Sequence, residues 1–391
     1  MNLNQALDVL IRTHLIAIER NERPISAELR SGPGLGKSST IFDSCSHLAR
    51  ATDQPVGLVT EMLATWLSVD VRGFMIPQKA TDGTIRPVTV FTIPPWYPVR
   101  HNTTVFYPDG TYATPTTWDH PVPTIGIVFL DEFGQGEDDV KKASAELLLN
   151  GRVGNDQLPV GWRVIAASNR LSDRSGVLRS LPFITNRRME INVSPDLDTW
   201  NDWVNRLEPT KRPHHMTISF ANKHPDLVFR DEVPPGDAPF CTPRTLMMMD
   251  QSLQSLRSKE DVTADRMPTD PIAREVCTGL IGGSEAAQFF VHIKYADEIP
   301  DISEIERDPM RAKLNDRRDV QMVTSFMLAH HLTAKNGSQI MKYISRMNVE
   351  MAALAIRTIS NQPDRAAMMV NNRDFSNWLI QHKDVLIASH T

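Results

Sequence analysis

The hydrophobic residues in the first half of the chain follow two alternating patterns. Apolar residues recur at helical spacing over residues 4–18, which predicts a helix there. Residues 124–130 are nearly all apolar, which is typical of a strand buried on both faces of a parallel sheet. Strands that alternate with helices in this way predict an α/β fold. Further strands are predicted over 25–29, 56–60, 164–167 and 189–193, and further helices from about 38 to 49, over 61–69 and over 137–150.

Beyond Pro195 the strand pattern ends, and helical spacing dominates. Helices are predicted over residues 319–334, 339–359 and 374–387. A chain of 391 residues is too long for one typical core, so more than one domain is expected. We therefore predict an αβα core with a parallel sheet over residues 1–194. An all-helical lid and a helical C-terminal extension are predicted over residues 195–391.

Residues 72–123 interrupt the alternation of strands and helices. Nine prolines with interspersed aromatic residues occur there, which indicates an ordered insertion with a hairpin at Asp109-Gly110. The segment is too aromatic for a flexible linker. Trp96 and Tyr97 have two interpretations that the sequence leaves equally open. They could contact a partner, or they could pack the insertion onto the core.

A glycine-rich segment lies between the first predicted strand and the following helix. It can bind phosphate, because glycines expose successive backbone N–H groups and the helix adds the positive end of its dipole. Lys37 would reach the β- and γ-phosphates of a nucleotide, and Ser38 would ligate Mg²⁺. An ordinary glycine turn before a helix is the alternative. The candidate nucleotide-binding residues are Gly32, Pro33, Gly34, Leu35, Gly36, Lys37, Ser38 and Ser39.

Polar side chains follow two of the predicted buried strands. Asp131 ends the apolar stretch 124–130, where a metal-orienting carboxylate is needed, and Glu132 beside it could polarise an attacking water. Asn169 follows the next strand, and its amide could hold the water or the γ-phosphate. Each of these residues could equally be a turn residue that ends a strand. Their order after the glycine-rich segment favours a nucleotide site with Ser38 and Asp131 as metal ligands.

Composition and charge narrow the class of protein. The net charge of −5 argues against a surface that binds nucleic acid generally, although a local basic patch is compatible with it. Three widely spaced cysteines suggest neither a disulfide framework nor a zinc site, so we expect a reduced, cytoplasmic setting. No apolar run is long enough to predict a membrane span. Adjacent histidines occur at 214–215 and 330–331, but sequence neighbours do not share a helix face, so we expect no metal site there.

Five segments in a fixed order resemble the motifs of the AAA+ superfamily, and more narrowly those of MoxR-like and dynein-related ATP-binding proteins of bacteria and phages. The resemblance covers residues 25–250. It implies that Lys37 and Ser38 belong to Walker A, and that Asp131 and Glu132 belong to Walker B. The segments that carry it are 32–38, 128–132, 164–170, 181–187 and 242–244.

The resemblance also implies roles for three residues outside these two motifs. Asn169 matches sensor 1, Arg187 the arginine finger and Arg244 sensor 2. From spacing alone, residues 186–188 are a solvated basic turn, and Arg244 is a surface residue of a helix that Thr242 caps. Two positions depart from the family pattern. Ser31 replaces the first Walker glycine, and Arg188 stands where the family often has Phe, so either Arg187 or Arg188 could be the finger.

These observations predict a P-loop ATP hydrolase that binds Mg²⁺ and ATP. The resemblance implies a homo-oligomeric ring, usually a hexamer, with ATP at subunit interfaces. We expect a chaperone-like ATPase that remodels a partner macromolecule, with a protein as its client. Two alternatives stay open: a nucleic-acid-directed motor of a phage or mobile element, and an interaction protein whose assembly is regulated by nucleotide.

Overall fold

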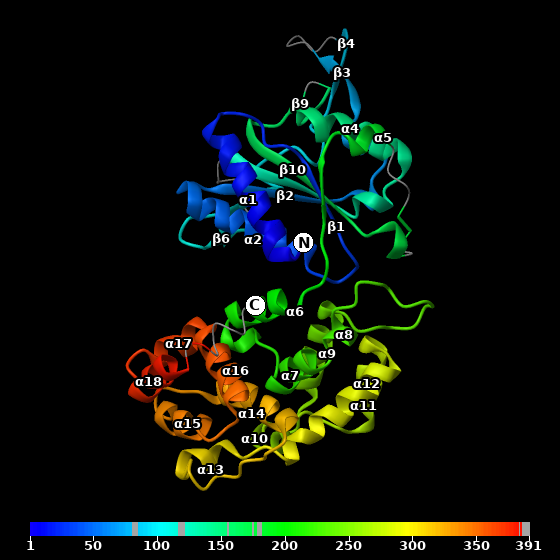
Figure 1. Ribbon diagram of the computed structural model, residues 1–391. Coiled ribbons are helices and arrows are strands. Elements are labelled where there is room, and N and C mark those ends of the chain that lie inside the picture. Colours follow the sequence, from blue (N-terminus) through cyan, green and yellow to red (C-terminus); the bar gives the residue numbers. More distant parts are fainter. Residues whose placement is uncertain are drawn as a thin grey trace. The chain divides into compact units, whose positions relative to one another are not determined.

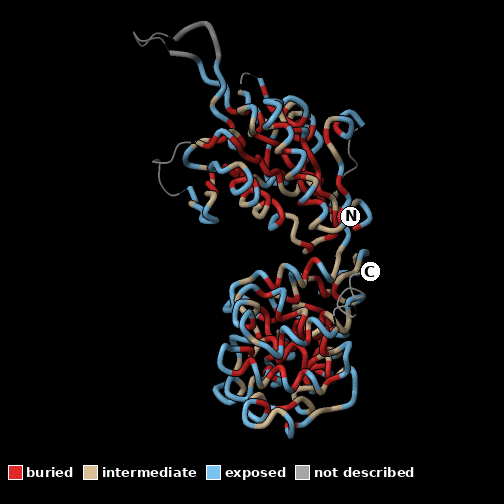
Figure 2. The backbone as a smooth tube through the Cα atoms, turned by 60° about the vertical axis from the view of Figure 1, so that its left-hand side comes forward, coloured by how far each residue is buried: buried red, intermediate tan, exposed pale blue. Residues whose placement is uncertain are grey.

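The computed structural model describes residues 1–79, 85–115, 122–154, 156–173, 176–177, 182–382 and 384. It divides into two compact units. The first is Met1–Pro195 with Asp231–Val233, and the second is Asp196–Arg230 with Pro234–Thr391. Buried residues form a separate core in each unit (Figure 2). Each unit is therefore described by itself.

The first unit is built on a seven-stranded sheet in the order β11-β1-β10-β7-β2-β5-β6 (Figure 1). The first five of these strands run parallel, and β5 and β6 continue the sheet antiparallel. The strands are β1 (Ala27–Arg30), β2 (Val56–Met62), β5 (Thr104–Phe106), β6 (Tyr112–Ala113), β7 (Ile125–Asp131), β10 (Gly161–Ser168) and β11 (Met189–Asn192).

Helices cover both faces of this sheet. On β7, Ile127 and Phe129 pack with α1 and α2, whereas Val128 and Leu130 point to the opposite face and pack with α4. Because neighbouring strand residues alternate between faces, a strand buried on both sides must be apolar throughout. The fold class predicted from the sequence, α/β with a parallel sheet followed by helices, is thus confirmed. The helices of this unit are α1 (Leu3–Glu19), α2 (Lys37–Thr52), α3 (Ser68–Arg72), α4 (Asp138–Asn150) and α5 (Pro182–Thr185).

The segment after β2 differs from the prediction. The helix expected over 61–69 is absent, because β2 continues to Met62 and is followed by a 3₁₀ turn, Leu63–Thr65, and the short α3. Leu63 and Trp66 are buried against the same sheet face as Trp96. Their apolar spacing therefore reflects a buried turn and not a helix.

The insertion contains two hairpins. The predicted turn at Asp109-Gly110 joins β5 and β6, and Gly110 has a φ of 90°. A second hairpin, β3 (Met75–Lys79) with β4 (Ile85–Phe91), was not predicted, and it projects from the rest of the unit in Figure 1. Outside the insertion, β8 (Arg152–Val153) pairs with β9 (Asp156–Gln157) in a short two-stranded sheet. The predicted insertion also includes residues 80–84 and 116–121, which lie outside the described residues.

Trp96 packs into the core of the first unit. Its side chain is fully buried, and its indole Nε1–H donates to the carbonyl oxygen of Val71 at 2.7 Å. Tyr97 packs partly against the same cluster. Of the two interpretations of this pair, packing of the insertion onto the core is the one that the structure supports, and partner contact through Trp96 is wrong.

Helices are the only regular secondary structure among the described residues of the second unit, which contains two apolar clusters. The stretch 339–359 is two helices separated by a turn, and the last helix ends at Gln381, earlier than predicted; residues 383 and 385–387 of that prediction lie outside the described residues. The helices are α6 (Leu197–Arg206), α7 (His215–Lys223), α8 (Pro225–Val228), α9 (Pro243–Leu256), α10 (Lys259–Thr263), α11 (Pro271–Ile281), α12 (Gly283–His292), α13 (Ile302–Arg307), α14 (Arg318–His331), α15 (Gly337–Ile344), α16 (Val349–Ser360), α17 (Pro363–Met369) and α18 (Arg373–Gln381).

Candidate phosphate-binding site

The glycine-rich segment 31–36 joins the end of β1 to the start of α2. Gly34 and Gly36 have φ angles of 73° and 95°, a left-handed conformation that residues with a Cβ rarely adopt. Gly36 is the N-cap of α2 and makes no side-chain capping bond, so the first N–H groups of this helix are not capped by a side chain. The positive end of the α2 dipole therefore lies beside the glycine-rich loop, which suits an anion.

The side chain of Lys37 crosses this loop and reaches the end of β10. Its Nζ donates to Asn169 Oδ1 at 2.8 Å, to Ser31 Oγ at 3.1 Å and to the carbonyl oxygen of Gly32 at 3.2 Å. Ser31 is buried, and its hydroxyl also donates to the Gly32 carbonyl at 3.0 Å. The serine that departs from the family pattern is thus accommodated, since its hydroxyl supports the lysine.

Ser38 and Asp131 meet at the ends of neighbouring elements. The Ser38 hydroxyl donates to Asp131 Oδ2 at 2.9 Å, and the backbone N–H of Glu132 donates to Asp131 Oδ1 at 2.9 Å. Glu132 has a φ of 52°, so the chain turns sharply immediately after β7. This turn places two carboxylates next to each other in sequence at the carboxyl end of a buried parallel strand, where such sheets bind ligands.

Lys141 of α4 holds the turn that follows Glu132. Its buried Nζ donates to the carbonyl oxygen of Gly134 at 2.9 Å. Burial lowers the pKa of Lys141, and the nearby carboxylates of Asp138 and Glu28 act in the opposite direction. Lys141 was not predicted from the sequence, because a lysine in an amphipathic helix usually lies on the solvated face.

A buried ionic cluster lies behind the phosphate loop and was also missed. Glu28 of β1 is fully buried, accepts a hydrogen bond from Ser168 Oγ at 2.5 Å and pairs with both Arg188 and Arg30. Ser168 immediately precedes Asn169. The available signal was a glutamate between the apolar residues Ala27 and Leu29 in a predicted strand of a parallel sheet, because a charge buried there requires a partner.

The two candidate finger arginines have different environments. The Arg188 side chain is fully buried, pairs with Glu28 and lies over the ring of Phe133. Arg187 is partly exposed, with its guanidinium carbon 5.5 Å from the centre of the Phe183 ring, and it forms no ion pair with a described residue. Arg188 is therefore not part of the solvated basic turn suggested by spacing, and of the two only Arg187 is placed to reach outward.

Arg244 belongs to the second unit. It is exposed in the first turn of α9, where Thr242 is the N-cap and forms a capping box with Thr245. The structure brings together Lys37, Ser38, Asp131 and Asn169, with Glu132 adjoining Asp131. It does not bring Arg187 into hydrogen-bond contact with them. Leu181, the first residue of the resembling segment 181–187, lies outside the described residues.

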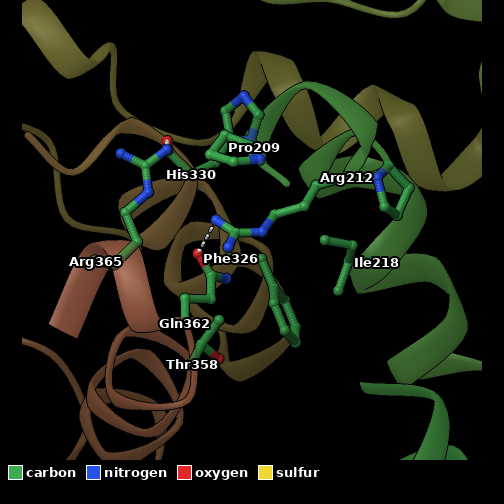
Figure 3. A pocket seen from close by; sticks show the side chains of 9 residues that line it. Pro209, Arg212, Ile218, Phe326, His330, Thr358, Gln362 and Arg365 are labelled. Carbon is green, nitrogen blue, oxygen red and sulfur yellow. Dashed lines mark hydrogen bonds between the residues drawn. The ribbon is translucent and has the colours of Figure 1, made fainter. Parts of the chain in front are cut away.

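A small cavity occurs in the second unit (Figure 3). Arg212 extends along it and donates through Nη1 to Gln362 Oε1 at 3.0 Å. The same guanidinium pairs with Asp364, so its charge is already balanced within the protein. The cavity is therefore not an alternative phosphate site. Its lining residues are Pro209, Arg212, Pro213, Ile218, Phe326, His330, Thr358, Gln362 and Arg365.

Comparisons with known proteins give distant structural similarity only. No protein-family model matches the chain, and no curated protein sequence matches it. A RuvB mutant from Thermotoga maritima is similar over 78% of this chain and 76% of that one, at 10% identity and a TM-score of 0.35. NtrX from Brucella abortus is similar over 78% of this chain and 61% of its own, at 15% identity and a TM-score of 0.35. A structure of NtrX from Brucella abortus in complex with ATP is similar over 96% of this chain and 68% of its own, at 13% identity and a TM-score of 0.32. Similarity at this level carries no functional argument.

None of the helices in the described residues is both long enough and apolar enough to span a membrane. The sequence-based expectation of no membrane span agrees with this finding.

Proposed function

We propose that this chain is an ATPase of the AAA+ type that binds Mg-ATP at the loop 31–38. One observation carries the proposal. Lys37 and Ser38, adjacent at the start of α2, bond to Asn169 at the end of β10 and to Asp131 at the end of β7. A turn that merely started a helix would not require these four polar side chains to converge from three elements. Their convergence matches the roles that P-loop ATPases distribute among a lysine, a hydroxyl, a carboxylate and an amide.

The side chains fit a magnesium ion. An octahedral ion with bonds of about 2.0–2.1 Å has neighbouring ligand oxygens about 3 Å apart. Ser38 Oγ and Asp131 Oδ2 are separated by 2.9 Å. Ser38 and Asp131 would hold the ion directly or through water, and the bound ion would neutralise charge on the β- and γ-phosphates.

The remaining residues would divide the work of hydrolysis. Lys37 would exchange its contacts with Ser31 and Gly32 for phosphate oxygens, and residues 32–36 with Ser38 and Ser39 would surround the phosphates. Glu132 would orient the attacking water and accept its proton, and Asn169 would hold the water or the γ-phosphate. Arg187 of a neighbouring subunit and Arg244 of the second unit would stabilise the charge of the transition state.

We further propose that hydrolysis drives remodelling of a protein client by a homo-oligomeric ring, with a hexamer as the expected size. The β3–β4 hairpin is the proposed client contact, in place of Trp96. Its described apolar side chains Met75, Ile76, Val90 and Phe91 are exposed, as is the preceding Phe74. Exposed apolar side chains clustered on a projecting element are typical of interaction surfaces.

Two substitutions test the ATPase proposal. Lys37→Ala should weaken ATP binding by about 10- to 100-fold, because charge-assisted hydrogen bonds are worth about 1.5–3 kcal/mol. Glu132→Gln should bind ATP with unchanged affinity and lose most turnover, since glutamine keeps the shape but cannot accept the proton. Binding is measured by equilibrium titration and turnover by phosphate release. Lys142→Ala and Glu137→Gln, two exposed positions on or beside α4, are the matched controls. Wild-type turnover by Glu132→Gln would show that the catalytic assignment is wrong.

A further inference from the structure

Four histidines and one aspartate converge within the second unit. His214 and His215 lie at the start of α7, Asp265 follows α10, and His330 and His331 end α14. Within the described residues, the only groups of three or more His, Cys, Asp or Glu side chains with ligand atoms within 4.8 Å of one another are here. They are His214, His215 and Asp265, and Asp265, His330 and His331.

At His214 and His215, the expectation of no metal site used a helix geometry that does not apply. His214 is the N-cap of α7 and has extended backbone, so it and His215 are not successive residues of a regular helix. Their rings are 4.3 Å apart and both reach Asp265. The rule that sequence neighbours face apart holds inside a helix but not across its first residue.

The two oxygens of Asp265 have different partners. Oδ1 is held by His214 Nε2 at 3.1 Å and by Arg257 Nη2 at 3.1 Å. His214 Nδ1 accepts the backbone N–H of Met216 at 3.2 Å, so the proton of this imidazole must be on Nε2. His214 is therefore fixed as a donor to Asp265 and cannot offer a lone pair through Nε2. Together with Arg257 it orients the carboxylate.

Oδ2 of Asp265 contacts two other histidines, and no hydrogen bond to a backbone N–H of a described residue fixes the tautomer of either ring. The Nε2 atoms of His215 and His331 each lie 2.8 Å from it. His215 is almost completely buried, and its Nδ1 has no hydrogen-bond partner among the described residues. A buried imidazole nitrogen without a partner is costly, because it has lost its contact with water. This orphaned nitrogen is not the one that faces Asp265, so the case for a bound ion rests on the two Nε2 atoms that converge on Oδ2.

We propose that Asp265, His215, His330 and His331 bind one divalent transition-metal ion of the zinc class, and that His214 and Arg257 position Asp265 through its other oxygen. Imidazole nitrogens with one carboxylate suit Zn²⁺, whereas Mg²⁺ and Ca²⁺ prefer oxygen ligands. Four protein ligands would fill a tetrahedral shell, as in structural zinc sites. The ion would tie α7, the turn after α10 and the end of α14 together.

The distances require only small movements. Tetrahedral zinc with bonds of about 2.0–2.1 Å separates neighbouring ligand atoms by about 3.3 Å. The 2.8 Å contacts at Oδ2 would therefore open by about half an ångström. His330 borders the cavity of Figure 3, so its ring has adjacent space in which to move. Asp265 itself is held with a φ of 49°, a conformation uncommon outside glycine that recurs at functional positions.

The first test uses the unmodified protein. The chain is stripped with a chelator, then titrated with Zn²⁺ in competition with a chromophoric chelator. One tightly bound Zn²⁺ per chain and a raised thermal unfolding midpoint are expected, with no comparable effect of Mg²⁺ in the absence of nucleotide. Substitution with Co²⁺ should give the intense visible absorption of a tetrahedral site. The absence of stoichiometric Zn²⁺ binding would overturn the proposal without affecting the proposed ATPase.

Substitutions then locate the ion. Asp265→Asn and His331→Gln should each lower the Zn²⁺ affinity by at least about 100-fold. His214→Asn keeps a residue suited to the helix cap but removes the contact to Asp265, so a loss of about 10- to 100-fold is expected, as for other orienting residues. His101→Gln in the first unit is the control and should bind as the wild type does. Circular dichroism and ATP binding check that each variant is folded. Wild-type affinity in folded Asp265→Asn and His331→Gln would show that any bound zinc lies elsewhere.

Discussion

At the scale of single residues, Glu28 is the buried negative charge beneath the glycine-rich loop 31–36. It is fully buried on β1 and balanced by Arg188 and Arg30, while Ser168 donates to its other oxygen. Because Ser168 precedes Asn169, the cluster connects the end of β10 to the arginine that follows Arg187. Glu28 and Arg188 therefore support the end of β10, behind the candidate site.

Arg188→Ala should destabilise the protein. Removing one partner of a buried ion pair costs about 3–5 kcal/mol, because the remaining charge is left without its partner. Arg30 still pairs with Glu28, so a loss near the lower end, about 3 kcal/mol, is expected. Urea unfolding followed by circular dichroism measures it. Arg187→Ala, the partly exposed neighbour, should cost less than about 1 kcal/mol. Equal effects of the two substitutions would contradict the proposed role of the buried pair.

His14 gives the first unit a predictable dependence on pH. The ring of this α1 residue is buried, and its Nε2 lies 3.0 Å from the carbonyl oxygen of Gly161. Burial lowers the pKa of His14 to about 4 from its usual 6.5. As the pH falls, His14 is therefore protonated at a higher pH in the unfolded chain than in the folded one. The contribution of neutral, buried His14 to the free energy of unfolding is complete above pH 6.5. It is lost as the pH falls through the folded-state pKa, by about 3 kcal/mol in total.

His14→Gln removes this titration while keeping a side chain that can donate to Gly161. Between pH 7 and pH 4, the free energy of unfolding should fall by about 3 kcal/mol less in this variant than in the wild type. Urea unfolding at several pH values measures the difference, and His101→Gln, an exposed histidine, should behave as the wild type does. Parallel pH profiles for wild type and His14→Gln would mean that His14 is accessible to protons in the folded state.

At the scale of elements, sequence pattern located the parallel strands well. A strand buried on both faces, such as β7, is a short, continuous apolar run that ends at polar residues, and this pattern is typical of a parallel sheet. The same pattern failed at 61–69, because Leu63 and Trp66 are buried by a turn, and burial alone produces apolar spacing. The β3–β4 hairpin was missed because prolines in and beside it suggested loops, although proline is tolerated at the edge of a two-stranded sheet.

The candidate site was predictable where its residues follow a strand or open a helix. Lys37, Ser38, Asp131 and Asn169 lie at such positions, and the parallel sheet brings their segments together. Glu28 and the histidine cluster depend on pairing between residues far apart in the chain. Asp265 is 50 residues from His215 and 66 residues from His331. Nothing local in the sequence joins these residues to their partners, so only the packed structure could identify the pairing.

Trp96→Ala tests the role of the insertion as part of the core. The indole is fully buried and bonded to Val71, so its removal should lower the free energy of unfolding by about 3–5 kcal/mol. Phe91→Ala on the exposed hairpin is the matched control and should change it by less than about 0.5 kcal/mol. Urea unfolding followed by circular dichroism compares the two. A folded, fully stable Trp96→Ala variant would restore partner contact as an interpretation of this residue.

At the scale of the whole molecule, the proposed ATPase needs an arginine finger. The first unit of a chain does not supply this arginine to the nucleotide site of the same chain. Lys37, Ser38, Asp131 and Asn169 are in contact through Ser38–Asp131 and Lys37–Asn169, whereas Arg187 makes no hydrogen bond to any of them. The partly exposed Arg187 is thus free of ion pairs with described residues and available to a neighbouring copy. Supplying this cation from another subunit would make hydrolysis depend on assembly.

The rate of ATP hydrolysis per subunit should therefore rise with protein concentration. Arg187→Ala should reduce turnover by on the order of 10³-fold while leaving ATP affinity of the single chain nearly unchanged, because the finger acts on the transition state. Mixing Arg187→Ala with Lys37→Ala should restore part of the activity. In a mixed assembly, an intact phosphate loop from the first variant can face an intact Arg187 from the second. Phosphate release at several concentrations and mixing ratios, with sedimentation of the same samples, measures both effects. A rate that is independent of concentration, together with no recovery on mixing, would show that Arg187 does not act between subunits.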